Sequence, residues 1–473
     1  MPIGLCLICA LLFSACATTP RSHPTSHPTS HPTRDGTVDV YQLVRLGPLA
    51  PGDGRTFSLE RDEILWTRDG TRLDRAQLAA KMRAYDVVLV GEIHASRAHQ
   101  AWQARIIETL ATTKDRPLAV GLEMLPRQVQ PVLDKRQSFP DERSFVLKIG
   151  WYRHWGHDYR YYRPIFRAAA AHTLPLLALN GPRKLNRALA RHGLDKLSPR
   201  LRALLPPMQL RSADHRRVFI KMINRSASRA GAQLRAQRHH HGTQHEKPHR
   251  GHGRDRRKSP VHSTTGHPHR MTHRHASSWL DRYFAAQVLW DATMADSALR
   301  YLSRAPRSRL VLLAGAGHVV YGVGIRRQLL ARRPQLKVLT VMPVRVPPTK
   351  PNARGIKAAR LISAGVADVL IGVAPPRPSD RYPSLGVKLE EQILETKRAG
   401  STSVLKVVGL PGKETAARRA GVRVGDVIHA IDGNPVKTVF DLRWALVDKV
   451  CGSALTLRLE RGGEKRTLTL TLK

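Results

Sequence analysis

The sequence predicts an α/β fold, with a mostly parallel sheet flanked by helices, followed by a small β-sandwich or barrel with one or two helices. Short apolar runs bounded by glycine, which are typical of buried parallel strands, alternate with segments of helical apolar spacing. Strands separated by helices indicate βαβ units. After residue 380 the periodicity changes, and short strands dominate to the end of the chain.

The predicted elements follow in chain order. Apolar runs predict strands of the first domain at 87–90, 118–122, 174–179 and 310–314, with edge strands at 338–341 and 366–373. Apolar residues at helical spacing predict helices at 101–110, 162–171 and 284–302. In the last segment we expect strands at 404–408, 427–431, 455–459 and 468–472, and one helix at 439–447.

Composition divides the chain into four segments. They are a signal peptide at 1–16, a Ser-, His- and Pro-rich tether at 17–37, an α/β domain at 38–376 and a second domain at 380–473. The α/β domain is interrupted at 226–277, where 11 of the 23 histidines lie. Such a loop would bind transition metals or haem iron weakly, or it is a low-complexity surface insertion; the sequence leaves both open.

The chain carries a formal charge of +43, from 79 Lys and Arg against 36 Asp and Glu. This charge favours anionic partners, such as phospholipid headgroups or the propionates of a porphyrin. Nucleic acid is not expected as a partner, because the arginines are spread along the whole chain and no zinc-finger spacing or RNA-binding signature accompanies them.

An apolar segment at 5–12 ends in Phe13-Ser14-Ala15-Cys16, which resembles a bacterial lipoprotein signal. Cleavage before Cys16 would leave that cysteine to carry lipid, including palmitate. We therefore expect an exported protein, lipid-anchored on the periplasmic side of a membrane or on the outer membrane of a Gram-negative bacterium. The alternative is an ordinary secretory signal. If Cys16 is lipidated, Cys451 is expected to be the free thiol of the mature protein.

Two copies of the pattern Gly-x-x-His, at 91–94 and 315–318, each directly follow an apolar run. Side chains just past the carboxyl ends of parallel strands gather in one crevice. Imidazoles and carboxylates there suit a divalent metal (Mn, Co or Zn), a haem, or proton transfer. A hydrogen-bonded structural role is the alternative for each histidine. The candidate metal ligands are Glu92, His94, His99, Glu123 and His318.

Aromatic and basic residues alternate at 151–164. Rings with interleaved arginines suit a planar porphyrin, with guanidinium groups meeting its propionates. Tyr and His are both axial ligands of haem iron. The alternative is a segment that packs its aromatic rings on the core. The candidate ligands in this segment are His154, His157, Tyr159, Tyr161 and Tyr162.

Five separated motifs between about 40 and 375 resemble the ChaN family of haem-binding, iron-regulated lipoproteins. The superfamily also includes TIKI-type metalloproteases and erythromycin esterase-like enzymes. The motifs are Gly91-Glu92-x-His94 with His99, Gly121-Leu122-Glu123-Met124, Leu179-Asn180-x-Pro182-Arg183, Gln287-x-Leu289-Trp290-Asp291-x-Thr293-Met294-Ala295, and Gly315-x-Gly317-His318 with Tyr321-Gly322.

This resemblance implies haem uptake at the cell surface with a tyrosine as iron ligand, for which Tyr321 joins the tyrosines named above. It also leaves open a metal-dependent hydrolase, because relatives of the TIKI type use the positions of His94, Glu123 and His318 as a hydrolytic centre. We therefore expect a haem-binding protein rather than an enzyme, with hydrolysis as the alternative.

The last segment resembles a PDZ domain of the bacterial exported-protease type, through residues 420–428 and 431–436. The resemblance implies that a carboxyl-terminal or extended peptide of a partner protein adds as a strand beside the edge, with 440–446 as the other wall of the groove. The expected peptide-binding loop is Ser384, Leu385, Gly386 and Val387. Together these observations predict a surface lipoprotein that binds haem and recruits a partner. The alternatives are the metal-dependent hydrolase and a scaffold without an active site.

Overall fold

The computed structural model describes residues 55–223, 273–346, 360–377, 380–396, 400–412 and 414–472. The expected signal peptide, the lipidated Cys16, the tether and the His-rich insertion up to residue 272 lie outside the described residues. Cys451 is exposed, and it forms no disulfide with the part of the chain that is described. None of the helices in these ranges is long and apolar enough to cross a membrane.

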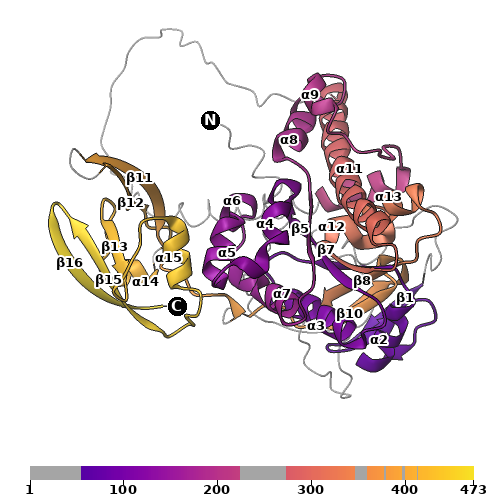
Figure 1. Cartoon of the computed structure of the whole chain (residues 1–473), viewed down its shortest axis with the longest axis horizontal. Coiled ribbons are helices and arrows are strands. Elements are labelled where there is room, and N and C mark those ends of the chain that lie inside the picture. Colours follow the sequence, from indigo (N-terminus) through magenta and orange to yellow (C-terminus); the bar gives the residue numbers. More distant parts are fainter. Residues whose placement is uncertain are drawn as a thin grey trace, which may run out of the picture.

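The first domain is built on a mostly parallel sheet flanked by helices, as the sequence predicts, and the sheet has eight strands (Figure 1). The strands from β10 to β6 all run parallel, and β2 and β3 form an antiparallel edge. In sheet order they are β3 (Arg72–Leu73), β2 (Ile64–Trp66), β10 (Val369–Val373), β8 (Val338–Arg345), β4 (Val87–Glu92), β7 (Arg309–Gly315), β5 (Leu118–Pro126) and β6 (Leu176–Asn180). A separate pair joins β1 (Thr56–Leu59) to β9 (Arg360–Ser363).

The expectation of edge strands at 338–341 and 366–373 is wrong. Strand β8 lies between β10 and β4, and β10 is covered on its other side by β2. Residues 364–366 form a short 3-10 turn, and the strand begins only at Val369. Both strands are apolar on both faces, which is the pattern of interior strands in a parallel sheet.

Helices cover both faces of the sheet, because alternate residues of each strand point to opposite sides. Val88 and Val90 pack with one helical layer, and Val87 and Leu89 with the other. The first layer holds α2 (Arg75–Arg83), α3 (Arg97–Thr113), α5 (Glu142–Lys148), α6 (Trp151–His154) and α7 (Tyr159–Ala171). The second holds α11 (His273–Arg304) and α13 (Ile325–Arg332), with α8 (Arg183–His192) packed on α11.

Helices α3, α7 and α11 contain the three helices that the sequence predicts, each with longer bounds. Short elements complete the domain. They are η1 (Arg127–Val129), α4 (Gln130–Asp134), η2 (Arg136–Ser138), α9 (Pro199–Arg202), α12 (Ala316–Val319), η3 (Val320–Gly322) and η4 (Ala364–Val366).

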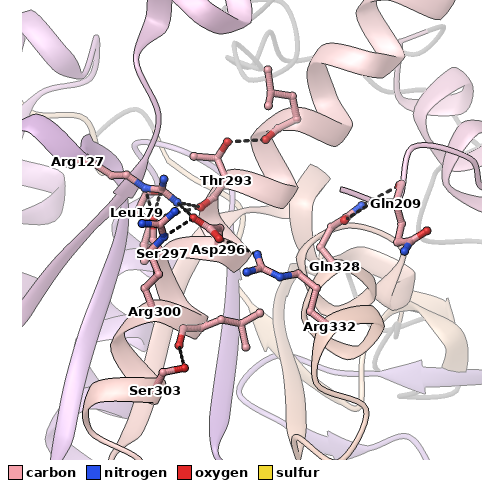
Figure 2. A network of polar contacts seen from close by, with 12 residues as sticks. Arg127, Leu179, Gln209, Thr293, Asp296, Ser297, Arg300, Ser303, Gln328 and Arg332 are labelled. Atoms are coloured by element: carbon pink, nitrogen blue, oxygen red, sulfur yellow. Dashed lines mark hydrogen bonds and ion pairs between the residues drawn. The ribbon is translucent and has the colours of Figure 1, made fainter. Parts of the chain in front are cut away.

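The long helix α11 is fixed to the sheet by a network around one carboxylate (Figure 2). Asp296 is buried, and its oxygens lie 2.7 Å from Arg127, 2.7 Å from Arg300 and 2.8 Å from Arg332. Burial raises the pKa of Asp296, but the three guanidinium groups lower it by more. The network joins α11 to the segment directly after β5 and to α13.

The second domain is a sheet in the order β11-β12-β13-β15-β16, with β14 beside β13. Its strands are β11 (Lys388–Thr396), β12 (Gly400–Gly409), β13 (Val427–Ile431), β14 (Asn434–Pro435), β15 (Ala454–Arg461) and β16 (Glu464–Thr471), and its helices are α14 (Ala416–Arg419) and α15 (Val439–Ala445). The four predicted strands and the predicted helix correspond to β12, β13, β15, β16 and α15. Strand β11, which forms one edge, has no counterpart among the predicted strands.

Candidate functional site

The two Gly-x-x-His patterns lie at strand ends on the same side of the sheet, as predicted, and the structure shows that the two strands are neighbours. Strands β4 and β7 pair in parallel, with Glu92 opposite Gly315. Gly91 is needed for close packing, since a Cβ there would lie 2.4 Å from Met342 Sδ. His94 and His318 therefore follow adjacent strands at one edge of the sheet.

The first cluster centres on Glu92, which is fully buried. Its Oε1 lies 2.5 Å from His94 Nδ1 and accepts from the Tyr162 hydroxyl at 2.9 Å. Its Oε2 accepts from the Gln100 amide at 2.9 Å. The carboxylate thus contacts His94 just after β4 and one side chain each of α3 and α7, so both of its oxygens have polar partners.

The second cluster centres on His318, whose imidazole lies between two carboxylates. Nδ1 is 2.6 Å from Asp291 Oδ1, and Nε2 is 3.5 Å from Glu123 Oε1. Burial lowers the pKa of His318, but Glu123 and Asp291 raise it by more, to about 10. Burial raises the pKa of Glu123, but His318 lowers it by more. The group is a buried imidazolium held by two anions.

Of the remaining oxygens of this second cluster, Glu123 Oε2 is hydrogen-bonded, whereas Asp291 Oδ2 has no hydrogen-bond partner among the described residues. Glu123 Oε2 accepts from Gly315 N at 2.5 Å, so the carboxylate also fixes the turn after β7. Asp291 Oδ2 lies 3.4 Å from His215 Nε2. Burial lowers the pKa of His215 to about 4, so this imidazole is neutral at pH 7.

His99 points back to the strand end, as predicted, and its Nδ1 accepts from Ile93 N at 3.2 Å. Burial lowers its pKa to about 3. Among the described residues no group of three or more His, Cys, Asp or Glu side chains is arranged to hold a metal ion. A divalent metal does not fit: Glu92 and His94 bond each other, His99 bonds the backbone, and His318 is an imidazolium paired with Glu123. The divalent-metal alternative therefore has no support.

The predicted tyrosine ligands differ in accessibility. Tyr159 and Tyr162 are buried, and their hydroxyls donate to Glu142 and Glu92. Tyr161 is half-buried against Tyr382 of the second domain. Tyr321 has a left-handed φ of 60° and lies against Gly365, so it does not lie with the other three tyrosines.

His154 and His157, at the turn between α6 and α7, are both half-buried. The ring of His157 lies 5.2 Å from His94 and 5.5 Å from Trp155. Burial lowers the pKa of His157 to about 4. A Cβ on the adjacent Gly156 would meet nothing within 4 Å, so this turn borders open space. His157 therefore connects the buried Glu92 cluster to the surface.

Asp291, His215 and Gln100 are site residues that the sequence reasoning missed. Asp291 lies within a quoted motif, but nothing local shows that it faces His318. His215 and Gln100 have no flanking pattern at all. Only a prediction of α11 packing against the end of β7 would have found Asp291.

The expected peptide-binding loop precedes the edge strand β11. Gly386 has a φ of 74°, and a Cβ there would lie 2.4 Å from Thr415 Cβ, so the loop requires glycine. Helix α15 lies beside β11, where Val439 N donates to Glu391 Oε1 at 2.7 Å. Phe440 and Trp444 of α15, however, point away from the expected groove and pack on the first domain.

The fold and site define an α/β domain with a polar centre at its strand ends, joined to a small β domain with two short helices. A family model described as "Haem-binding uptake, Tiki superfamily, ChaN" matches residues 78–329. The chain belongs to this haem-binding family. A PDZ domain model matches residues 383–472, and the second domain is a PDZ domain. We call the first domain the haem-family domain.

Many solved structures match parts of this chain, and three of them illustrate the two folds. "Cofacial heme binding to ChaN of Campylobacter jejuni" matches with 16% identity and a TM-score of 0.44, over 66% of this chain and 98% of that chain. An HtrA-type protease, AlgW with decapeptide, matches with 19% identity and a TM-score of 0.17, over 25% and 45%. A serine endoprotease from Yersinia pestis matches with 20% identity and a TM-score of 0.16, over 20% and 29%. No curated protein matches the chain.

Proposed function

We propose that this protein binds haem at the turn between α6 and α7, and that His157 supplies the nitrogen ligand to the iron. The observation that carries the proposal is the half-buried imidazole of His157, next to His94 and Trp155, in a chain of the haem-binding family. The side chain that binds the iron must be accessible to haem. Among the candidates, His157 is accessible from the surface and also packs beside aromatic rings.

The charge state of His157 supports this role. Because burial lowers its pKa to about 4, the imidazole keeps a free nitrogen lone pair at pH 7. Neutral imidazole is a common axial ligand of haem iron. By contrast, the phenols of Tyr159 and Tyr162 are buried and already donate to carboxylates. Burial raises the pKa of both phenols, which disfavours the phenolate.

Basic residues beside the turn suit the propionates of haem. Arg183 donates to the carbonyl oxygens of Arg153 and His154, which fixes the end of α6. The Arg153 side chain is exposed at the same turn. Guanidinium groups form strong paired hydrogen bonds with carboxylates, so these two arginines are suited to orient the porphyrin.

The decisive experiment is a hemin titration of the whole chain, followed by the Soret band. The wild type takes up hemin stoichiometrically, and we expect His157→Ala to bind about ten-fold or more weakly. His192→Ala is the control, because His192 is an exposed histidine at the end of α8. If Tyr161→Phe rather than His157→Ala removes the Soret band, the ligand assignment fails, and if the wild type gives no Soret band, haem binding fails.

We further propose that the protein is a lipoprotein at the bacterial cell surface, on the periplasmic side or the outer membrane, and that it serves haem uptake while the PDZ domain recruits a partner peptide. The signal-like segment ending in Cys16 and the membership of the haem-binding family support this proposal. Metabolic labelling with palmitate tests it: wild type takes up label and Cys16→Ser does not. Equal labelling, or release of both proteins as soluble material, would argue for an ordinary secretory signal.

A further inference from the structure

The PDZ domain packs on the haem-family domain through helix α15. Phe440 lies 6.1 Å from Tyr152, and Trp444 stacks on Tyr159 with ring centroids 6.2 Å apart. Figure 1 shows α15 on the side of the PDZ domain that faces α5 and α6. Aromatic contacts of this kind hold two surfaces in a defined orientation.

Ion pairs flank these aromatic contacts. Arg143 lies 2.6 Å from Asp441 of α15, and Arg163 pairs with Asp448 just beyond it. Asp448 and Arg143 are exposed, so these pairs add little to stability and mainly set the orientation.

The centre of the contact is Arg160 of α7, which is 5% exposed. Its Nη1 donates to Leu446 O and its Nη2 to Pro383 O, both at 3.0 Å. The same guanidinium is paired with Asp158, so its charge is compensated within its own domain. A buried arginine thus satisfies two backbone carbonyls of the other domain, and its removal would leave both without this donor.

A proline in α7 completes the contact. Pro164 lies inside the helix and has no N–H, so it cannot bond the carbonyl of Arg160 four residues earlier. The hydroxyl of Tyr382 donates to this carbonyl at 2.9 Å, and its ring lies 4.7 Å from the Arg160 guanidinium. Pro164 therefore leaves the Arg160 carbonyl without a helical donor, and Tyr382 of the PDZ domain donates to it instead.

The two carbonyls bound by Arg160 lie beside the two elements that are expected to line the peptide groove. Pro383 directly precedes the loop 384–387, and Leu446 ends helix α15. Peptide recognition by strand addition needs the loop and the helix wall at a fixed separation. The haem-family domain therefore holds both parts of the peptide site in place.

The same helix also reaches the buried Glu92 cluster. Tyr162, two residues after Arg160, donates to Glu92 at 2.9 Å and accepts from Ala95 N at 3.4 Å. Glu92 in turn holds His94, whose ring lies beside His157. Helix α7 thus contacts the peptide site with one face and the proposed haem site with another.

We propose that Arg160 is a positioning residue for the PDZ peptide site, and that α7 couples this site to the proposed haem site. The coupling to haem rests on the proposed function; the positioning role does not. Because coupling is reciprocal, haem would change the affinity for peptide by the same factor by which peptide changes the affinity for haem.

Hydrogen–deuterium exchange on the full chain tests the proposal without a known peptide. We compare wild type with Arg160→Ala and with Arg167→Ala, which is an exposed arginine of α7 that pairs with Glu142 of its own domain. In Arg160→Ala, the protected amides of 446–449 and of 93–96 should both exchange about ten-fold faster, whereas Arg167→Ala should leave both unchanged. Tyr382→Phe, which removes one hydrogen bond of the contact between the domains, should give the same pattern at smaller amplitude if Arg160→Ala does not fold.

The outcomes separate the two proposals. If only one of the two segments, or neither, exchanges faster in the folded variants, the coupling is overturned. Hemin added to wild type should slow exchange at 446–449 about five-fold. If a Soret band forms while this exchange stays unchanged, coupling to haem fails and haem binding stands. If no Soret band forms, haem binding fails, and the exchange of the apo variants still decides whether Arg160 positions the peptide site.

Discussion

The two Gly-x-x-His patterns share a motif and a sheet edge but differ in their surroundings. His94 bonds Glu92 and lies beside the half-buried His157, whereas His318 is enclosed between Glu123 and Asp291. The first is a hydrogen-bonded cluster that connects to the surface, and the second is a buried ionic cluster. The same short pattern thus lies near the surface in one place and is fully enclosed in the other, because different helices supply the neighbours.

The largest expected effect comes from breaking the ionic cluster. Asp291→Ala removes one of the two anions that hold the His318 imidazolium, so we expect a loss of about 3–5 kcal/mol in the free energy of unfolding. Urea titration followed by tryptophan fluorescence measures it. Asp281→Ala is the control on the same helix, because Asp281 is exposed and pairs with Arg216 at the surface. Equal losses in the two variants would show that His318 is not held by charge.

The pH dependence of stability separates the two clusters further. The pKa of His318 is raised from 6.5 to about 10, so its contribution is complete below pH 6.5 and is lost as the pH rises toward 10. Within this window the free energy of unfolding of wild type should fall by about 1 kcal/mol per pH unit relative to that of His318→Gln. Urea titrations between pH 6 and 9 measure the difference. Parallel pH profiles for the two proteins would contradict an imidazolium at this position.

Removing one donor from the hydrogen-bonded cluster around Glu92 should destabilise the protein less. Tyr162→Phe removes one of three donors to Glu92, and we expect a loss of about 1.5 kcal/mol in the free energy of unfolding. The Soret band of the hemin complex should keep its position, since the phenol of Tyr162 is bonded to Glu92. Tyr301→Phe, at a half-buried tyrosine of α11, is the matched control. Loss of the Soret band in Tyr162→Phe alone would identify Tyr162 as the iron ligand.

The smallest effect concerns the pH dependence of haem binding. Protons compete with iron for an imidazole, and an ordinary histidine loses affinity about ten-fold per pH unit below 6.5. The pKa of His157 is lowered to about 4, so its affinity for hemin should stay constant from pH 8 to pH 5.5 and fall only near pH 4. Hemin titrations across this range measure it. A steep loss beginning at pH 6.5 would point to an exposed histidine instead.

Much of the fold follows from local patterns. The apolar runs of β4, β5 and β7 predict buried parallel strands, and parallel strands bring their carboxyl ends to one edge, so the meeting of the two patterns is predictable. The central position of β8 is not predictable in this way, because strand order depends on which apolar faces pair and not on any single strand. Strand β11 was missed because charged residues at 388, 390 and 391 hide its alternation.

By itself, the sequence determined the domain families, the α/β class and the placement of His94 and His318 at one sheet edge, because these depend on motifs and on local periodicity. Only the tertiary structure decided that His318 is locked by Asp291, and that Arg160 and Tyr382 join the two domains. These contacts connect residues 27 and 222 positions apart. Pairings at such separations depend on how helices pack on the sheet and on each other, which no local pattern encodes.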